Sequence, residues 1–177
     1  MDKSIITPVT TYDHVFNVDD FKTILKKVSG PVWEFGHTTY PKEDPRFRLC
    51  TPFWKVELQD DEFFAVHLLN KIERVTDNKY TLDHVYANGH TYGLDGTFHL
   101  DDYNSNSMTF LLYAMPKWKK EWGGYTSYQI SETELYSVYP EPNKGVLHHG
   151  DCYHTSGPIS RQYPGLRVTI AWKLTLK

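Results

Sequence analysis

The sequence is poor in cysteine and contains no secretory or membrane-spanning segment. Its 177 residues include two cysteines, Cys50 and Cys152, which are too few for the disulfide framework of a small secreted domain. The first residues lack the apolar core of a signal peptide, and no run of 18 apolar residues could cross a bilayer. We therefore expect a cytoplasmic protein with free thiols and no membrane association.

A strong charge of either sign is also missing. The chain has 19 Lys and Arg against 22 Asp and Glu, and its net charge is −3. The densest basic cluster, Lys117 to Lys120, is interrupted by Trp118, so no basic groove for duplex nucleic acid is expected. Hydrophobic residues at 40% and charged residues at 23% are typical of a globular chain, and we expect one domain over residues 1–177.

Helical patterns occur early and strand patterns late. Aromatic residues make up 15% of the chain, which favours pleated sheets. Apolar residues spaced three and four apart predict helices over residues 19–28 and 60–74, and residues 36–53 between them resemble a loop. Short apolar runs between turn residues predict strands over residues 80–86, 96–101, 108–114, 126–130, 136–138, 145–149 and 167–176.

This order predicts an α+β, mainly β fold: a double-stranded β-helix (jelly roll) with N-terminal buttressing helices. Its core would span about residues 60–177, with residues 1–59 as a helical and loop part. The last strand has the clearest alternation. One of its faces carries Arg167, Thr169, Ala171 and Lys173, and the other carries Val168, Ile170, Trp172 and Leu174.

Two histidines and an aspartate form the main candidate site. His99 and Asp101 are two residues apart on a predicted strand, so both side chains would share a face. His154 lies further along the chain, in a histidine-rich segment. Two histidines and one carboxylate form the facial triad of non-haem Fe(II) oxygenases, which leaves coordination positions open for a co-substrate and O₂.

Other histidines compete for these roles. His149 and Asp151 form a second His-x-Asp pair, but its only downstream histidine, His154, is too near for strands to intervene. His148 and His149 are alternatives to His154 as the distal ligand, and one of the two could point inward as a partner of the ligands. We favour His154 because a polar turn and an arginine-headed strand follow it.

Arg167 is the candidate anion-binding residue. It begins an otherwise apolar strand, where a buried arginine needs a partner of opposite charge. A guanidinium pairs with a carboxylate through two parallel hydrogen bonds, and Thr169 on the same face could donate to that same carboxylate. Arg161, in a polar loop, is the alternative cation.

The chain resembles the prolyl-4-hydroxylase-like branch of the Fe(II)/2-oxoglutarate-dependent oxygenases, particularly its short, single-domain members from phages and bacteria. The resemblance covers roughly residues 60–177. The matching stretches are residues 86–101, with the His-x-Asp pair, 109–114, 118–124 with Trp-Gly-Gly, 154–158 with His-Thr-Ser-Gly-Pro, and 164–174.

The resemblance implies a ligand set and a reaction. Fe(II) would be bound by His99, Asp101 and His154, which are also the catalytic residues. The co-substrates would be 2-oxoglutarate and O₂, and hydroxylation of a C–H bond would release succinate and CO₂. Residues implied to bind 2-oxoglutarate are Arg167, Thr169, Tyr113, Asn88 and Tyr92.

Substrate identity is left open by the sequence. The first expectation, by resemblance, is a prolyl residue of a peptide or protein; a free amino acid, a nucleotide or a small metabolite would suit the same core. The family usually has Asp where this chain has His149, and many prolyl 4-hydroxylases have lysine where it has Arg167. Two rivals are a catalytically silent cupin-like metal-binding module and a zinc hydrolase, neither of which needs Arg167.

Overall fold

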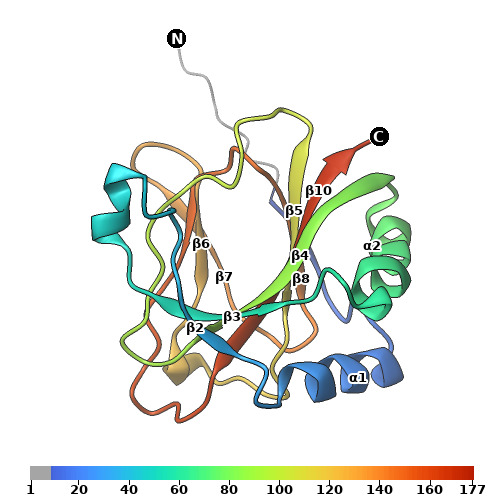
Figure 1. Ribbon diagram of the computed structural model, residues 1–177, viewed down its shortest axis with the longest axis horizontal. Helices are drawn as coiled ribbons and strands as arrows, with labels where there is room; N and C mark the ends of the chain where they lie inside the picture. Colours follow the sequence, from blue (N-terminus) through green and yellow to red (C-terminus); the bar gives the residue numbers. More distant parts are fainter. Residues whose placement is uncertain (1–8) are drawn as a thin grey trace.

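Two antiparallel sheets face each other in the computed structural model, which describes residues 9–177 (Figure 1). The larger sheet contains, in spatial order, β1 (Thr10–Tyr12), β8 (Gly145–His149), β5 (Ser107–Tyr113), β10 (Arg167–Leu176), β4 (Tyr80–His90), β3 (Phe53–Glu57) and β2 (Glu34–His37). The smaller sheet contains β7 (Leu135–Val138), β6 (Thr126–Gln129) and β9 (His154–Ser156). The predicted mainly β architecture is confirmed.

Both predicted helices are present. Helix α1 (Val18–Val28) begins at Asn17, whose side chain accepts a hydrogen bond from the backbone of Asp20 at 2.9 Å. The second predicted helix starts as a π-helical turn, Phe63–Leu68, and continues as α2 (Leu69–Thr76). Neither these nor any other helix in the described part of the chain is long and apolar enough to span a bilayer.

The helices pack on the outer face of the larger sheet and form the main core with it (Figure 1). The predicted alternation of β10 is confirmed, because its apolar residues, Val168, Ile170, Trp172 and Leu174, all join this core. The indole nitrogen of Trp172 donates to the carbonyl of Phe64 at 3.0 Å, which fixes the π-helical turn to the sheet. The opposite face of β10 is thereby turned toward the smaller sheet.

The N-terminal part contributes more to the sheet than we expected. Strands β2 and β3 pair with each other, and β3 pairs with β4, so two segments before residue 60 extend the larger sheet. The predicted loop over residues 36–53 contains a 3₁₀ turn, Pro45–Leu49, and the ends of both strands. Strands β1 and β9 were also not predicted; each has only three residues, too few for a period-two pattern.

The prediction of a strand over residues 96–101 is wrong. Only His99 forms a β-bridge there, through two backbone hydrogen bonds of 3.0 Å with His154. The backbone of Asp101 instead donates to the carbonyl of Gly150 at 2.9 Å, and the carbonyl of Thr97 accepts from the His99 ring. The segment's backbone groups therefore bond to β9 only at Gly96 and His99, and otherwise to a turn and a side chain, so no continuous ladder forms.

Candidate active site

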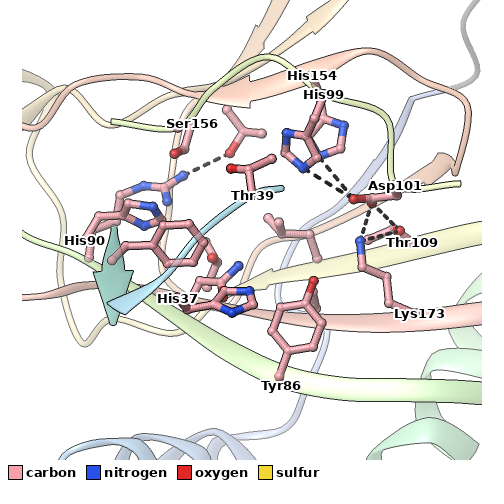
Figure 2. A pocket seen from close by; sticks show the side chains of 18 of the residues that line it. His37, Thr39, Tyr86, His90, His99, Asp101, Thr109, His154, Ser156 and Lys173 are labelled. Atoms are coloured by element: carbon pink, nitrogen blue, oxygen red, sulfur yellow. Dashed lines mark hydrogen bonds and ion pairs between the residues drawn. The ribbon is translucent and has the colours of Figure 1, made fainter. Parts of the chain in front are cut away.

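One pocket lies between the inner faces of the two sheets (Figure 2). Tyr113 is completely buried and is not part of the pocket lining, while Tyr92 is 54% exposed and lies against Arg161, also outside that lining. Six of the eight site residues predicted from the sequence line the pocket, namely His99, Asp101, His154, Asn88, Arg167 and Thr169.

The two histidines and the aspartate converge at one end of the pocket. Oδ1 of Asp101 lies 3.4 Å from Nε2 of His99 and 3.9 Å from Nε2 of His154. One ligand atom from each residue lies within 4.8 Å of the other two, so the three could hold a single metal ion. The backbone bridge between His99 and His154 brings the histidines together, and the bond from Asp101 to Gly150 adds the carboxylate.

Both rings are oriented for metal binding. Nδ1 of His99 lies 2.8 Å from the carbonyl of Thr97, and Nδ1 of His154 lies 2.8 Å from the carbonyl of Cys152. A carbonyl only accepts, so Nδ1 of each ring carries a proton, and Nε2 of each ring is directed toward Asp101. Burial holds the pKa of His154 well below its usual value, which keeps the ring neutral. Two imidazole nitrogens and one carboxylate oxygen suit Fe(II) or another divalent transition metal.

His148 lies behind this cluster. Its ring is fully buried, 4.7 Å from the His154 ring, and its Nδ1 donates to the carbonyl of His149 at 2.9 Å. Burial lowers the pKa of His148 to about 4. Its Nε2 has no hydrogen-bond partner and lies 4.0 Å from Oδ2 of Asp101. Of the two alternating histidines, His148 is thus the one that points inward, whereas His149 is partly exposed.

Two further residues contact Asp101 that the sequence did not single out. Thr109 donates to Oδ2 of Asp101 at 2.6 Å, and the ammonium of Lys173 forms an ion pair with the same oxygen (Figure 2). Burial acts to raise the pKa of Asp101, but Lys173 and the surrounding histidines hold it well below its usual value. The only sequence signal was the position of Lys173 on the same face of its strand as Arg167.

Arg167 lies toward the other end of the pocket, beside its strand partner His90, which Figure 2 shows opposite the Asp101 end. Its Nε donates to the carbonyl of Gly124 at 2.7 Å and its Nη2 to Oγ1 of Thr126 at 2.9 Å. Gly124 has a φ of +70°, and a Cβ there would lie 2.9 Å from Cδ of Arg167. The glycine therefore fits both the turn and the arginine beside it.

Arg167 is 1% exposed, and its guanidinium forms no ion pair with a carboxylate within residues 9–177, since its hydrogen bonds go to Gly124 and Thr126. Burial lowers its pKa, and the neighbouring Tyr113 and Tyr128 offset this loss of water only in part. A buried charge without a counter-ion is expensive to maintain. An anionic ligand that enters the pocket would supply the missing partner.

Thr126 lies between Arg167 and Tyr113. Its Oγ1 accepts hydrogen bonds from the Tyr113 hydroxyl at 2.7 Å and from Arg167 at 2.9 Å, so its own hydroxyl hydrogen can be donated to a ligand. Thr126 and Arg167 line the pocket and Tyr113 does not, so Tyr113 acts on the pocket through Thr126 and through Arg167, whose guanidinium carbon lies 5.5 Å from the centre of the Tyr113 ring. Sequence reasoning missed Thr126, which begins a predicted strand without any distinguishing motif.

Buried polar atoms without partners also occur in this pocket. Oδ1 of Asn88 and Nδ1 of His90 are both buried without a hydrogen-bond partner, and both residues line the pocket. Buried polar groups are normally satisfied by protein, water or ligand. The Arg167 end of the pocket is thus polar and incompletely satisfied, as expected of a site for a polar ligand.

His90 should make the protein sensitive to acid. Burial, assisted by the charge of Arg167, lowers the pKa of His90 to about 3. The unfolded chain protonates this ring near pH 6.5, so its contribution destabilises the folded state progressively as pH falls from about 6.5 toward 3. The free energy of unfolding should fall between pH 7 and pH 5, and we expect this fall to be about 2 kcal/mol smaller in His90→Phe than in the unsubstituted chain. Urea unfolding of the metal-free protein at both pH values measures it. An equal fall in unfolding free energy in both proteins would contradict this prediction. The control is His14→Asn, because His14 is exposed.

Comparisons with known proteins find structural matches but no sequence matches. No protein-family model and no curated protein matches the sequence. A prolyl hydroxylase from Trichoplax adhaerens, solved in complex with a hypoxia inducible factor oxygen degradation domain peptide fragment, is similar with a TM-score of 0.69 and 15% identity, over 96% of this chain and 84% of that chain. The viral collagen prolyl hydroxylase of Paramecium Bursaria Chlorella virus-1, in a 2OG complex, gives 0.57 and 13%, over 98% and 99%.

A third similar structure has a different activity. It is a non-heme alpha ketoglutarate dependent epimerase from nogalamycin biosynthesis, with a TM-score of 0.66 and 8% identity, over 96% of this chain and 78% of that chain. The chain therefore has the double-stranded β-helix fold of 2OG-Fe(II) oxygenases, which confirms the predicted fold and the predicted resemblance. At 8–15% identity the likeness extends to the fold, and one fold serves several reactions.

Proposed function

We propose that the protein is an Fe(II)- and 2-oxoglutarate-dependent dioxygenase that hydroxylates a C–H bond and releases succinate and CO₂. The observation that carries this proposal is the pairing of two features in one pocket. A His-Asp-His cluster able to hold a metal ion occupies one end, and Arg167, buried without a counter-ion among the described residues, lies toward the other. A silent metal-binding module or a zinc hydrolase would need the cluster alone.

The protein's own residues would bind and orient. His99, Asp101 and His154 would hold Fe(II), which with 2-oxoglutarate and O₂ supplies the oxidising chemistry. Arg167 would pair with the far carboxylate of 2-oxoglutarate, and the free hydroxyl hydrogen of Thr126 would donate to it. Because Arg167 is almost completely buried, little water competes for this contact, and the pair is correspondingly strong.

Asn88 and Thr169 would complete this binding site. They are partners in the register of β4 and β10, and both face the pocket next to Arg167. A ligand that donates, or a water molecule that bridges, would satisfy Oδ1 of Asn88. Tyr113 would act indirectly, by fixing Thr126.

We further propose a prolyl residue of a peptide or protein as the first substrate to test. Two of the similar structures are prolyl hydroxylases, and one of them was solved in complex with a peptide fragment. His37, the last residue of β2, and Thr39, just after that strand, both line the pocket. Residues 37–48 are a candidate lid over the pocket, and residues 103–107, in and next to a polar turn, are a second candidate.

The test is anaerobic titration of metal-free protein with Fe(II) and then 2-oxoglutarate, followed by admission of O₂. A 2-oxo acid bound to iron gives a weak visible charge-transfer absorption, and we expect this band to appear and succinate to form. Peptides with proline are then compared with free amino acids, nucleotides and small metabolites for stimulation of succinate release. Metal binding without the band would contradict the proposal and favour a module or hydrolase.

A further inference from the structure

We propose that Lys173 is a positioning residue that, with Thr109, holds one oxygen of Asp101 away from the metal, so that this carboxylate provides a single ligand atom. The inference rests on the proposed function, because it concerns the same His-Asp-His cluster. It assigns a role to a lysine that neither binds the metal nor is needed for the 2-oxo acid.

The two oxygens of Asp101 have separate surroundings. Oδ1 faces the Nε2 atoms of His99 and His154, at 3.4 and 3.9 Å. Oδ2 turns the other way, where it accepts from Thr109 at 2.6 Å and pairs with Lys173 (Figure 2). The carboxylate is therefore already divided into an oxygen that faces the metal site and an oxygen that is held by the protein.

The fold places both partners rigidly. Thr109 and Lys173 are Cα partners in the register of β5 and β10, and Nζ of Lys173 donates to Oγ1 of Thr109 at 3.2 Å. The side chains of Lys173 and Asp101 are 22% and 6% exposed, so the pair is largely removed from water. Residues on two central neighbouring strands of the larger sheet hold their geometry better than residues on a loop.

Lys173 is already engaged by these contacts. Its ammonium group pairs with Asp101 and donates to Oγ1 of Thr109, and Tyr86 adds a further electrostatic interaction. It is therefore poorly suited to capture an anionic substrate, although it lines the pocket. Its charge acts on the carboxylate instead.

The consequence concerns the number of open positions at the metal. A carboxylate can bind a divalent ion through one oxygen or through both. A facial triad leaves three positions free only if its carboxylate takes one. With Oδ2 held by Lys173 and Thr109, Asp101 takes one position, and room for a chelating 2-oxo acid and O₂ is preserved.

Lys173→Met tests this directly, because it keeps the length of the side chain and removes its charge and hydrogen bonds. We expect divalent metal to bind about tenfold more tightly, since a nearby positive charge is gone and both oxygens become available. We expect 2-oxoglutarate to bind the metal-loaded protein about tenfold more weakly, because the second oxygen occupies one of its positions. Lys173→Arg keeps the charge and should restore both values. Calorimetric titration with Co²⁺, and then with 2-oxoglutarate, measures both without turnover.

Lys71→Met is the matched control. Lys71 forms an ion pair with Asp20 outside the pocket, with side chains 26% and 11% exposed, so it reproduces the loss of a largely buried lysine–aspartate pair. Neither affinity should change in this variant. If Lys173→Met does not fold, Thr109→Val, which frees Oδ2 in part, should shift both affinities in the same directions by a smaller factor.

The outcomes separate this inference from the proposed function. Unchanged Co²⁺ and 2-oxoglutarate affinities in folded Lys173→Met would overturn the positioning role while leaving the oxygenase proposal intact. An unsubstituted protein that binds Co²⁺ but no 2-oxoglutarate would overturn the oxygenase proposal. The change in Co²⁺ affinity in Lys173→Met would then decide the role of Lys173. Weaker Co²⁺ binding in Lys173→Met would also overturn the inference, because it would mean that the lysine helps Asp101 to bind metal.

Discussion

Asp101→Asn is expected to abolish Fe(II) binding and 2-oxoglutarate turnover. The substitution keeps the shape of the side chain and removes the only carboxylate of the metal cluster. Loss of a residue that only hydrogen-bonds to a metal ligand costs about 10–100-fold in metal affinity, so loss of the ligand itself should cost more than about 100-fold. Equilibrium dialysis with Fe(II) under anaerobic conditions measures the affinity, and succinate release measures turnover.

The same variant should be less stable without metal. Lys173 would lose its carboxylate partner while remaining largely buried, which costs about 3 kcal/mol. Urea unfolding of the metal-free protein checks this, and circular dichroism shows whether the fold is retained. Asp151→Asn is the control, because Asp151 belongs to the second His-x-Asp pair and is exposed. Full Fe(II) affinity in folded Asp101→Asn, or its loss in Asp151→Asn, would contradict the ligand assignment.

Strong local patterns predicted most of this architecture. The alternation of β10 follows directly from its sequence, and it correctly separated Val168 and Trp172, which face the helices, from Arg167 and Lys173, which face the pocket. Both helices were predicted because their apolar residues recur at helical spacing and because acidic residues begin both predicted segments, 19–28 and 60–74. Such patterns depend only on residues close in the chain, so a single sequence contains them in full.

The wrong prediction of a strand over residues 96–101 has a different cause. His99 and Asp101 were expected to converge because alternate residues of a strand share a face. They converge instead because the backbone of His99 bridges to His154 and that of Asp101 bonds to Gly150. The two side chains converge as expected, but they do so through contacts with residues about 50 positions further along the chain, which no local sequence pattern contains.

The supporting residues of the site were the least predictable part. Thr126 is an ordinary threonine at the start of a short strand, and only the fold brings its hydroxyl between Arg167 and Tyr113. Lys173 could be assigned to a face but not to a partner, since its pairing with Asp101 joins a central strand to an irregular segment. Roles that arise from tertiary contacts between unremarkable residues become visible only in three dimensions.

Arg167→Met is expected to raise the KM for 2-oxoglutarate by about 100-fold or more, with little change in Fe(II) affinity. Arg167 would supply charged hydrogen bonds to the far carboxylate, and each such bond is worth about 1.5–3 kcal/mol. It has no contact with the metal cluster among the described residues, since its hydrogen bonds go to Gly124 and Thr126. The variant therefore separates co-substrate binding from metal binding, which Asp101→Asn cannot do.

A 2-oxo acid without a far carboxylate makes this test specific. 2-Oxobutyrate can chelate the metal but has nothing for Arg167 to bind, so its weak affinity should be the same in the unsubstituted chain and in Arg167→Met. Arg161→Met is the matched control, because Arg161 is the exposed alternative cation and lies over the ring of Tyr92 outside the pocket lining. An equal loss of affinity for both 2-oxo acids in Arg167→Met would mean that the substitution only disturbs packing around Gly124. A loss in Arg161→Met alone would transfer the carboxylate-binding role to the loop.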